Sequence, residues 1–195
     1  MFAMKSTART FVTLSIALAA LFPAAVLAAE TYTADPVHSS VVFRVKHMST
    51  SHSWGRFNDL TGSFTLDPAD PTASKLAFTV KTASVDTNSK DRDNHLKSPD
   101  FFNAVQFPDI TFASKSVTKS ANGYEVRGTL SFHGVTKPVA FVLVPTGTGK
   151  DPKGNAIAGV DANFTLKQSD FGITKFASAI GDEVNVFVSI EGAKK

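Results

Sequence analysis

Apolar and polar residues alternate along much of the chain after residue 41, with the period of two that marks a half-buried β-strand. At the start of this region, Phe43, Val45 and His47 fall on one side, whereas Arg44 and Lys46 fall on the other. Comparable segments lie at 54–57, 61–66, 76–81, 110–117, 124–132, 139–143, 160–166 and 183–191. The pattern therefore predicts about eight strands.

Turn signals separate these segments. Asp67-Pro68 follows one strand, and Asn122-Gly123 predicts a tight hairpin because both residues tolerate positive φ. A glycine-rich loop is expected over 147–159. Antiparallel strands with one buried face close economically as a barrel or a sandwich, and an eight-stranded barrel can hold one ligand. The expected fold class is therefore all-β.

The stretch from 84 to 112 breaks the alternation. Dense charged residues come first, and four closely spaced phenylalanines follow. Thr87 or Asn88 can cap a short helix, and Ser98-Pro99-Asp100 predicts a second helix start, because proline there needs no N–H donor. We therefore expect a helical insertion around 88–103. It is either a lid over an apolar space or an ordinary connection with solvated charges.

The first 28 residues predict a secretory signal peptide. Lys5 and Arg9 precede a long apolar run, and Val26-Leu27-Ala28 supplies a cleavage site of small residues. The rival interpretation is an uncleaved membrane anchor, since the apolar run is nearly long enough to span a bilayer. We expect cleavage after Ala28. The product is then a single periplasmic or secreted domain over 29–195, with no transmembrane segment.

Composition narrows the possible functions. The chain has no cysteine, which excludes disulfides, thiolate metal sites and thiol nucleophiles. Positive and negative charges nearly balance once the signal peptide is removed, and no cluster of Lys and Arg indicates a nucleic-acid surface. The chain has 17 phenylalanines, two tyrosines and one tryptophan. Because phenylalanine brings apolar area without a polar group, this bias predicts a bulky core or an apolar cavity.

Several motifs are distinctive together: YTADPVHS at 32–39, GRF at 55–57 with GSF at 62–64, SVDT…RDNHLKSPDFF…FPDITF within 84–112, GVTKP at 134–138 and SDFG at 169–172. In these motifs the chain resembles the YceI-like, polyisoprenoid-binding, lipocalin-like proteins of bacteria, from Tyr32 to Gly192. The resemblance implies an extended eight-stranded antiparallel barrel whose cavity holds a long-chain amphiphile. Ser49 and Gln168 depart from the family pattern, in which glycine and a basic residue are common.

Catalytic and metal-ligating patterns are weak. The five histidines, His38, His47, His52, His95 and His133, show neither His-x-His nor HExxH spacing, so no metal site is expected. No GxSxG motif accompanies the serines, and neighbouring aspartates such as Asp91 and Asp93 are typical of a solvated surface. We therefore expect a binding protein rather than an enzyme, with no cofactor.

The expected ligand is a polyisoprenoid or another long-chain lipid, because apolar burial contributes roughly 0.8 kcal/mol per CH₂ group. The predicted wall residues are phenylalanines chosen by alternation: Phe43, Phe57, Phe64, Phe78, Phe102, Phe112, Phe132, Phe141 and Phe164. Polar specificity is expected from His38, Arg92, His95 and Asp170.

Two questions stay open at this point. Arg92 is expected to clamp a loop by pairing with Asp86 or Asp170, although it can instead meet a ligand headgroup. The alternative functions are an enzyme acting on an isoprenoid or lipid, and a structural or stress-related protein whose interior is filled by its own phenylalanines. A homodimer is also compatible with the sequence.

Overall fold

The structure, a computed structural model, describes residues 29–194; the predicted signal peptide lies outside the described residues. The strands are β1 Glu30–Ala34, β2 Ser40–His47, β3 Ser51–Phe57, β4 Leu60–Leu66, β5 Lys75–Lys81, β6 Val85–Asp86, β7 Asp109–Ser120, β8 Gly123–Phe132, β9 Val135–Lys150, β10 Ala156–Lys167 and β11 Ile180–Lys194. The helices are α1 Lys90–Lys97 and the 3₁₀-helices η1 Pro71–Ala73, η2 Thr82–Ser84 and η3 Gln168–Phe171.

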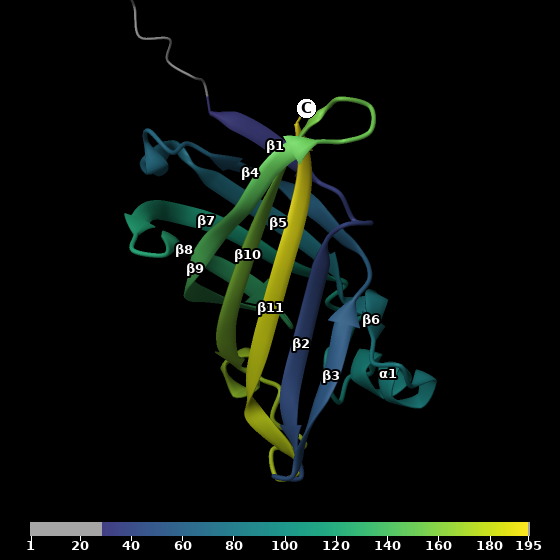
Figure 1. The fold of residues 1–195 in the computed structure, drawn as a ribbon. Helices are drawn as coiled ribbons and strands as arrows, with labels where there is room; N and C mark the ends of the chain where they lie inside the picture. The colour runs from purple at the N-terminus through teal and green to yellow at the C-terminus, as the bar shows by residue number, and fades with distance from the viewer. Residues whose placement is uncertain (1–28, 195) are drawn as a thin grey trace, which may run out of the picture.

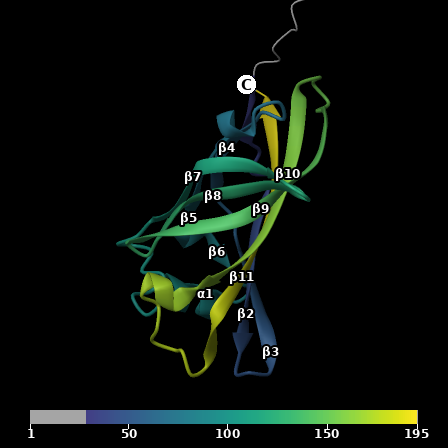
Figure 2. The same ribbon diagram turned by 90° about the vertical axis from the view of Figure 1, so that its left-hand side faces the viewer.

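The strands build a closed barrel. In the sheet, β1, β4, β5, β7, β8, β9, β10 and β11 follow one another as antiparallel neighbours, and β1 pairs with β11 to complete the circle. Figure 1 shows β11 running nearly the whole length of the molecule, and Figure 2 shows β7, β8 and β9 crossing it from the side. The predicted eight-stranded antiparallel barrel is confirmed.

Three of the eight barrel strands are broken in two. The C-terminal end of β11 pairs with β1, and the rest of β11 pairs with β2, so β1 and β2 act as one strand with a bend over 35–39. In the same way β3 and β4 act as one strand, because β3 pairs with β2 and β4 pairs with β1. β5 and β6 also act as one strand, because β5 pairs with β4 and β6 pairs with β3. Each of these three barrel strands is interrupted by a short connection, over 35–39, 58–59 and 82–84.

The glycine-rich loop expected over 147–159 is wrong. β9 and β10 stay paired through most of this stretch, with a register shift between Gly159 and Val160. Only 151–155 form a loop, in which the Asp151 carboxylate accepts hydrogen bonds from the backbone N–H groups of Lys153 and Asn155, both at 2.8 Å. Ladder hydrogen bonds with a long partner strand outweigh the low strand propensity of glycine, because propensity is a weak local term.

Apolar side chains fill the end of the barrel that β1 closes. Phe64 is 1% exposed, Val117 and Val126 are 0% exposed, and Ile190 is 2% exposed. Tyr32 of β1 stacks on the Phe64 ring with a centroid distance of 5.4 Å. This core therefore closes one end of the barrel. The central insertion lies toward the other end.

The central insertion contains one short helix, as predicted, but the second predicted helix is wrong. Ser98 ends α1 instead, since its hydroxyl donates to the His95 carbonyl at 2.7 Å. The N–H groups of Phe102 and Ala104 then bond to the last carbonyls of α1, which consumes the groups that a new helix would need. The N-cap is Ser89 rather than Thr87 or Asn88. Among residues 29–194, no helix is long and apolar enough to cross a membrane.

Candidate functional site

A cavity of about 520 Å³ occupies the barrel interior between the core and the opposite end. Alternate residues of β2 line one wall, namely Val41, Phe43 and Val45, while Arg44 and Lys46 of the same strand are absent from the lining. This is the division that the alternation predicted, because successive side chains of a strand point to opposite faces. The lining is predominantly apolar.

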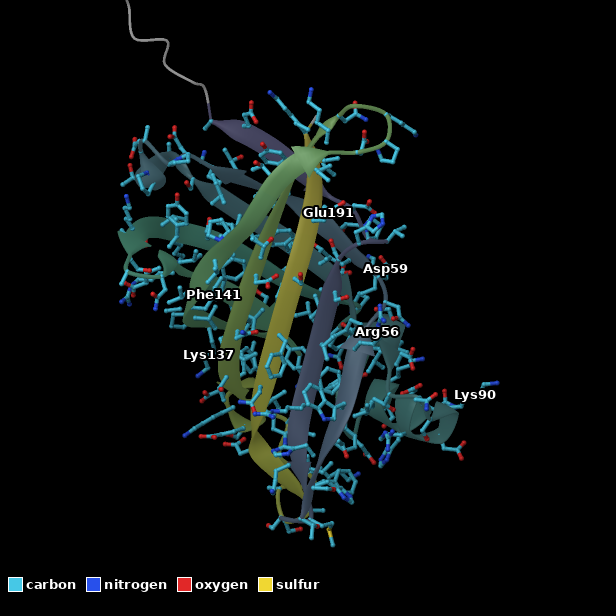
Figure 3. All side chains as sticks on the ribbon, in the orientation of Figure 1. Arg56, Asp59, Lys90, Lys137, Phe141 and Glu191 are labelled. Carbon is cyan, nitrogen blue, oxygen red and sulfur yellow. The ribbon has the colours of Figure 1, made fainter. Side chains whose placement is uncertain are left out.

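Eight of the nine predicted wall phenylalanines line this cavity: Phe43, Phe57, Phe78, Phe102, Phe112, Phe132, Phe141 and Phe164. Phe102 belongs to the insertion and joins rings of two barrel strands, at centroid distances of 6.0 Å to Phe57 and 5.4 Å to Phe132. Figure 3 labels Phe141, which lies on β9. Its ring packs on the rings of Phe112 and Phe164, with centroid distances of 5.2 and 5.0 Å.

Phe64 is the exception among the nine. It is missing from the cavity lining and lies in the closed-end core against Tyr32. Alternation assigns Phe64 correctly to the inner face of β4, but alternation says nothing about depth along the barrel axis. Whether an inward ring is core or wall depends on where the strand lies relative to the plug.

Selection by residue type missed another part of the wall. Alternate residues of β11, namely Val184, Val186, Val188 and Ile190, line the cavity together with Ile173 and Phe176 beyond η3. The period-two pattern of 183–191 contained this signal. It was overlooked because only phenylalanines were selected.

Polar lining residues gather toward one end of the cavity. They come from the β2–β3 hairpin, the residue after β6, α1 and η3, and are His47, Ser53, Thr87, Arg92, His95 and Gln168. The β2–β3 hairpin and α1 lie in the lower half of Figure 1, away from the plugged end. The cavity is therefore amphipathic along its length, with an apolar interior and a polar end.

Arg92 is held by Thr87 and not by a carboxylate. Its Nε donates to Thr87 Oγ1 at 2.7 Å, and its Nη2 donates to the Thr87 carbonyl at 2.6 Å. The Thr87 N–H and O–H donate in turn to Asp93 Oδ1, at 2.8 and 2.6 Å. The expected pairing of Arg92 with Asp86 or Asp170 is wrong, because Asp86 turns to Asn88 N–H and Asn58. The buried Thr87 therefore lies between Arg92 and Asp93 and bonds to both, so it anchors α1 to the end of β6.

A second set of contacts joins the insertion to the segment between η3 and β11. Lys175 Nζ donates to Asp100, whose other carboxylate oxygen lies 3.1 Å from His95 Nε2. The Phe101 ring stacks on Phe176 at 5.0 Å, and His95 meets both rings edge-on. Lys175 first, and then His95, lowers the pKa of Asp100, because each hydrogen bond favours the carboxylate form. The insertion is thus fastened across the polar end of the cavity as a lid.

His38 and Asp170 lie outside the cavity lining. His38 is in the β1–β2 bend, where its Nδ1 lies 2.8 Å from Asp35 Oδ2 and 3.7 Å from Glu191 Oε1. Asp35 raises the pKa of His38, since the carboxylate stabilises the imidazolium. Ligand atoms of these three residues lie within 4.8 Å of one another, so they are the group among residues 29–194 with metal-ligating geometry. One hydrogen bond, between His38 and Asp35, joins two of the three residues, and Glu191 lies beside them.

The family follows from a sequence match over the same residues that build the barrel. The profile of the YceI-like domain matches residues 32–192. The chain belongs to the YceI-like domain family. A UPF0312 protein of Yersinia enterocolitica is 45% identical over 157 residues, which cover 80% of this chain and 82% of that protein. A UPF0312 protein of Yersinia pestis is 43% identical over the same length and coverage.

Solved structures share the barrel. A YceI protein of Campylobacter jejuni has a TM-score of 0.69 and 33% identity, covering 77% of this chain and 90% of that chain. BcnA of Burkholderia cenocepacia has a TM-score of 0.74 and 23% identity, over 81% of this chain and 98% of that one. A polyisoprenoid-binding domain from Saccharophagus degradans, implicated in plant cell wall breakdown, has a TM-score of 0.62 and 17% identity, over 84% and 98%. The last two likenesses show the fold alone.

Proposed function

We propose that this YceI-like protein binds a polyisoprenoid or another long-chain lipid, with the apolar chain inside the barrel and the polar end group toward the lid. The observation that carries the proposal is the cavity of about 520 Å³, whose polar lining residues come from one end only. This volume falls in the range of pockets that enclose a single small ligand, roughly 300–1,000 Å³. The structural neighbour from Saccharophagus degradans is a polyisoprenoid-binding domain, which adds support at the level of the fold.

The energetics favour an apolar chain. Burial of ten CH₂ groups contributes on the order of 8 kcal/mol before losses. Ordering the ligand and dehydrating its polar end offset part of this gain. A lipid is therefore held firmly enough for carriage or storage, while the hydrogen-bonding groups at the lid end give it an orientation.

The cavity also weighs against the two alternative functions. A protein whose own phenylalanines fill the interior would have no space of this size. Chemistry on a lipid chain would require polar groups deep in the cavity, where the lining consists of residues such as Phe112, Leu130 and Val160. We therefore propose a binding role without catalysis.

Filling the cavity tests the binding role. Ala162 is 4% exposed and lines the cavity, whereas Asn163 follows it on β10 and is exposed. Ala162→Phe should abolish binding of a fluorescent isoprenoid or fatty-acid probe, and Asn163→Phe should bind it as the wild type does. Melting curves of both variants separate blocking from unfolding, since overpacking costs about 1–3 kcal/mol. A folded Ala162→Phe protein with wild-type affinity would place the ligand elsewhere.

We further propose that the protein is exported to the periplasm through a cleaved signal peptide. The support is the basic, apolar and small-residue order of residues 1–28. Intact mass of the exported protein should correspond to a chain that begins at Ala29. A membrane-bound species that retains Met1 would contradict cleavage.

A further inference from the structure

Two segments together form the tip of the barrel at the polar end of the cavity. The first is the β2–β3 hairpin, and the second is the segment 172–179 that leads into β11. They are joined by a hydrogen bond from Met48 N–H to the Ala179 carbonyl at 2.7 Å and by the pairing of His47 with Ile180. Figure 1 shows both segments at the end opposite to the C-terminus. His47, Ala179 and Ile180 also line the cavity, so the tip borders its polar end, which is called the mouth below.

The tip carries cations and no carboxylate. Between Asp35 and Asp59 the sequence contains no acidic residue, and the segment 171–181 contains none either. Lys175 is bound to Asp100, and Arg56 stands opposite Asp86 in the β3–β6 register. Arg44 and Lys46, in contrast, form no ion pair with any carboxylate among residues 29–194. The hairpin itself therefore carries positive charge. The nearest carboxylates, Asp182 and Glu183, follow on β11 opposite Lys46, and Asp182 accepts hydrogen bonds from Ser169.

Large apolar side chains are exposed on the same hairpin. Met48 at its turn is 60% exposed, and Trp54 on β3 is 50% exposed. Trp54 stacks on Phe187 at 5.6 Å, and the Arg44 guanidinium lies over both rings at 5.7 and 5.6 Å. Tryptophan prefers the level of lipid headgroups because its ring is apolar and its N–H is polar, and unpaired cations attract anionic headgroups. The hairpin combines both features at one place.

We propose that the tip formed by the β2–β3 hairpin and 172–179 docks on an anionic lipid bilayer, so that the cavity mouth faces the source of its lipid. The proposal rests on the proposed function, since docking explains how a chain with little solubility in water reaches the cavity. Two exposed apolar residues insert only shallowly, and charge attraction supplies much of the remaining affinity. Binding is therefore reversible and depends on salt, which suits a protein that must leave with its ligand.

The test uses the full mature protein and vesicles of phosphatidylglycerol mixed with phosphatidylethanolamine, compared with vesicles of phosphatidylcholine. Co-sedimentation measures the bound fraction. Trp54 is the one tryptophan of the chain, so its fluorescence reports contact of this hairpin with lipid. We expect binding to the anionic vesicles at low salt, with a shift of Trp54 emission to shorter wavelength. Binding should weaken as salt rises, because screening shortens the range of the attraction to about 10 Å at 0.1 M.

Matched variants locate the docking surface. Lys46→Glu should lower partitioning on the order of tenfold or more, since each basic residue near an anionic surface raises binding about fivefold and a reversed charge repels it. Met48 has φ of 49°, a conformation that asparagine tolerates well, so Met48→Asn removes the apolar group without disturbing the turn. The control is Lys119→Glu, the same charge change on the exposed end of β7 near a different hairpin. It should bind vesicles like the wild type.

Two results would overturn the docking proposal: a wild-type protein that ignores anionic vesicles at low salt, or equal losses in Lys46→Glu and Lys119→Glu. A short isoprenoid, farnesol, added without vesicles, distinguishes failure of the docking proposal from failure of the proposed function. Lys46→Glu should still bind farnesol in the absence of vesicles. Vesicle binding without any farnesol binding would keep the docking surface and reject the lipid cavity.

Discussion

Replacement of the Thr87 hydroxyl by a methyl group tests how the lid is anchored. Thr87→Val keeps the shape of a side chain that is 8% exposed, and it removes the acceptor of Arg92 Nε and the donor to Asp93. Hydrogen bonds to charged partners contribute about 1.5–3 kcal/mol each. Arg92 is exposed, so water replaces part of its contact, and two backbone contacts of Thr87 persist. We expect a loss of about 2 kcal/mol in the free energy of unfolding.

Urea denaturation and thermal melting measure this loss. For a domain of this size, about 2 kcal/mol corresponds to a melting temperature lower by roughly 4–8 °C. Thr118→Val, at an exposed position of β7, is the control for the same change of residue type and should stay within about 0.5 kcal/mol of the wild type. Arg92→Ala should cost less in the Thr87→Val background than alone, because the two residues share one contact.

Two outcomes would refute the reasoning. If Thr87→Val is as stable as Thr118→Val, the hydroxyl does not anchor α1. If Arg92→Ala melts like the wild type but loses affinity only for an anionic lipid probe, then Arg92 is a headgroup contact and not a structural clamp. Loss of stability with equal weakening of neutral and anionic probes is the result that the geometry predicts.

Two further predictions concern the wall and the closed end of the barrel. Gly55→Ala would place a Cβ 2.3 Å from Phe43 Cζ, so it should weaken lipid-probe binding and lower the free energy of unfolding by about 1–3 kcal/mol. Gly149→Ala, whose Cβ would have its nearest atom at 3.7 Å, should be nearly neutral. Equal behaviour of the two variants would contradict this packing. The hydrogen bond that Tyr32 donates to Glu30 raises the pKa of Tyr32 to about 12. The stability that this hydrogen bond contributes is therefore complete below the ordinary tyrosine pKa of about 10 and is lost as pH rises toward 12. Spectrophotometric titration should show the Tyr32 pKa falling in Glu30→Ala, and an unchanged value would remove Glu30 as the cause.

Local pattern determined the strands and the position of the insertion. The alternation in β2 assigned Phe43 and Val45 to one face and Arg44 to the other, and this division is the one between cavity wall and barrel exterior. The charged stretch near 90 broke that period, so a short helix was predicted there and found. Both inferences hold because the inward or outward direction of a strand residue and the start of a helical turn depend on residues close in sequence.

Position along the barrel axis depended on the tertiary structure. Phe64 and Phe78 both face inward, yet only Phe78 lines the cavity, because the strands around Phe64 converge on β1 at the plugged end. β1 itself, with five residues, was not predicted, since a strand this short is stabilised chiefly by its partners β4 and β11. Depth and closure arise from pairings between distant residues, such as Tyr32 with Phe64 and Tyr32 with Lys194, which no local pattern records.

The choice of polar partners was likewise decided in three dimensions. Asp86 and Asp170 were the expected partners of Arg92, and Arg92 bonds neither of them, because it donates to Thr87, which in turn donates to Asp93. The pairing of Asp100 with Lys175 joins residues 75 positions apart. The sequence by itself determined most of the strands, the position of the insertion and the phenylalanines of the apolar wall apart from their depth. Only the tertiary structure decided which end of the barrel is open and which contacts hold the lid, because geometry selects among side chains of similar chemistry.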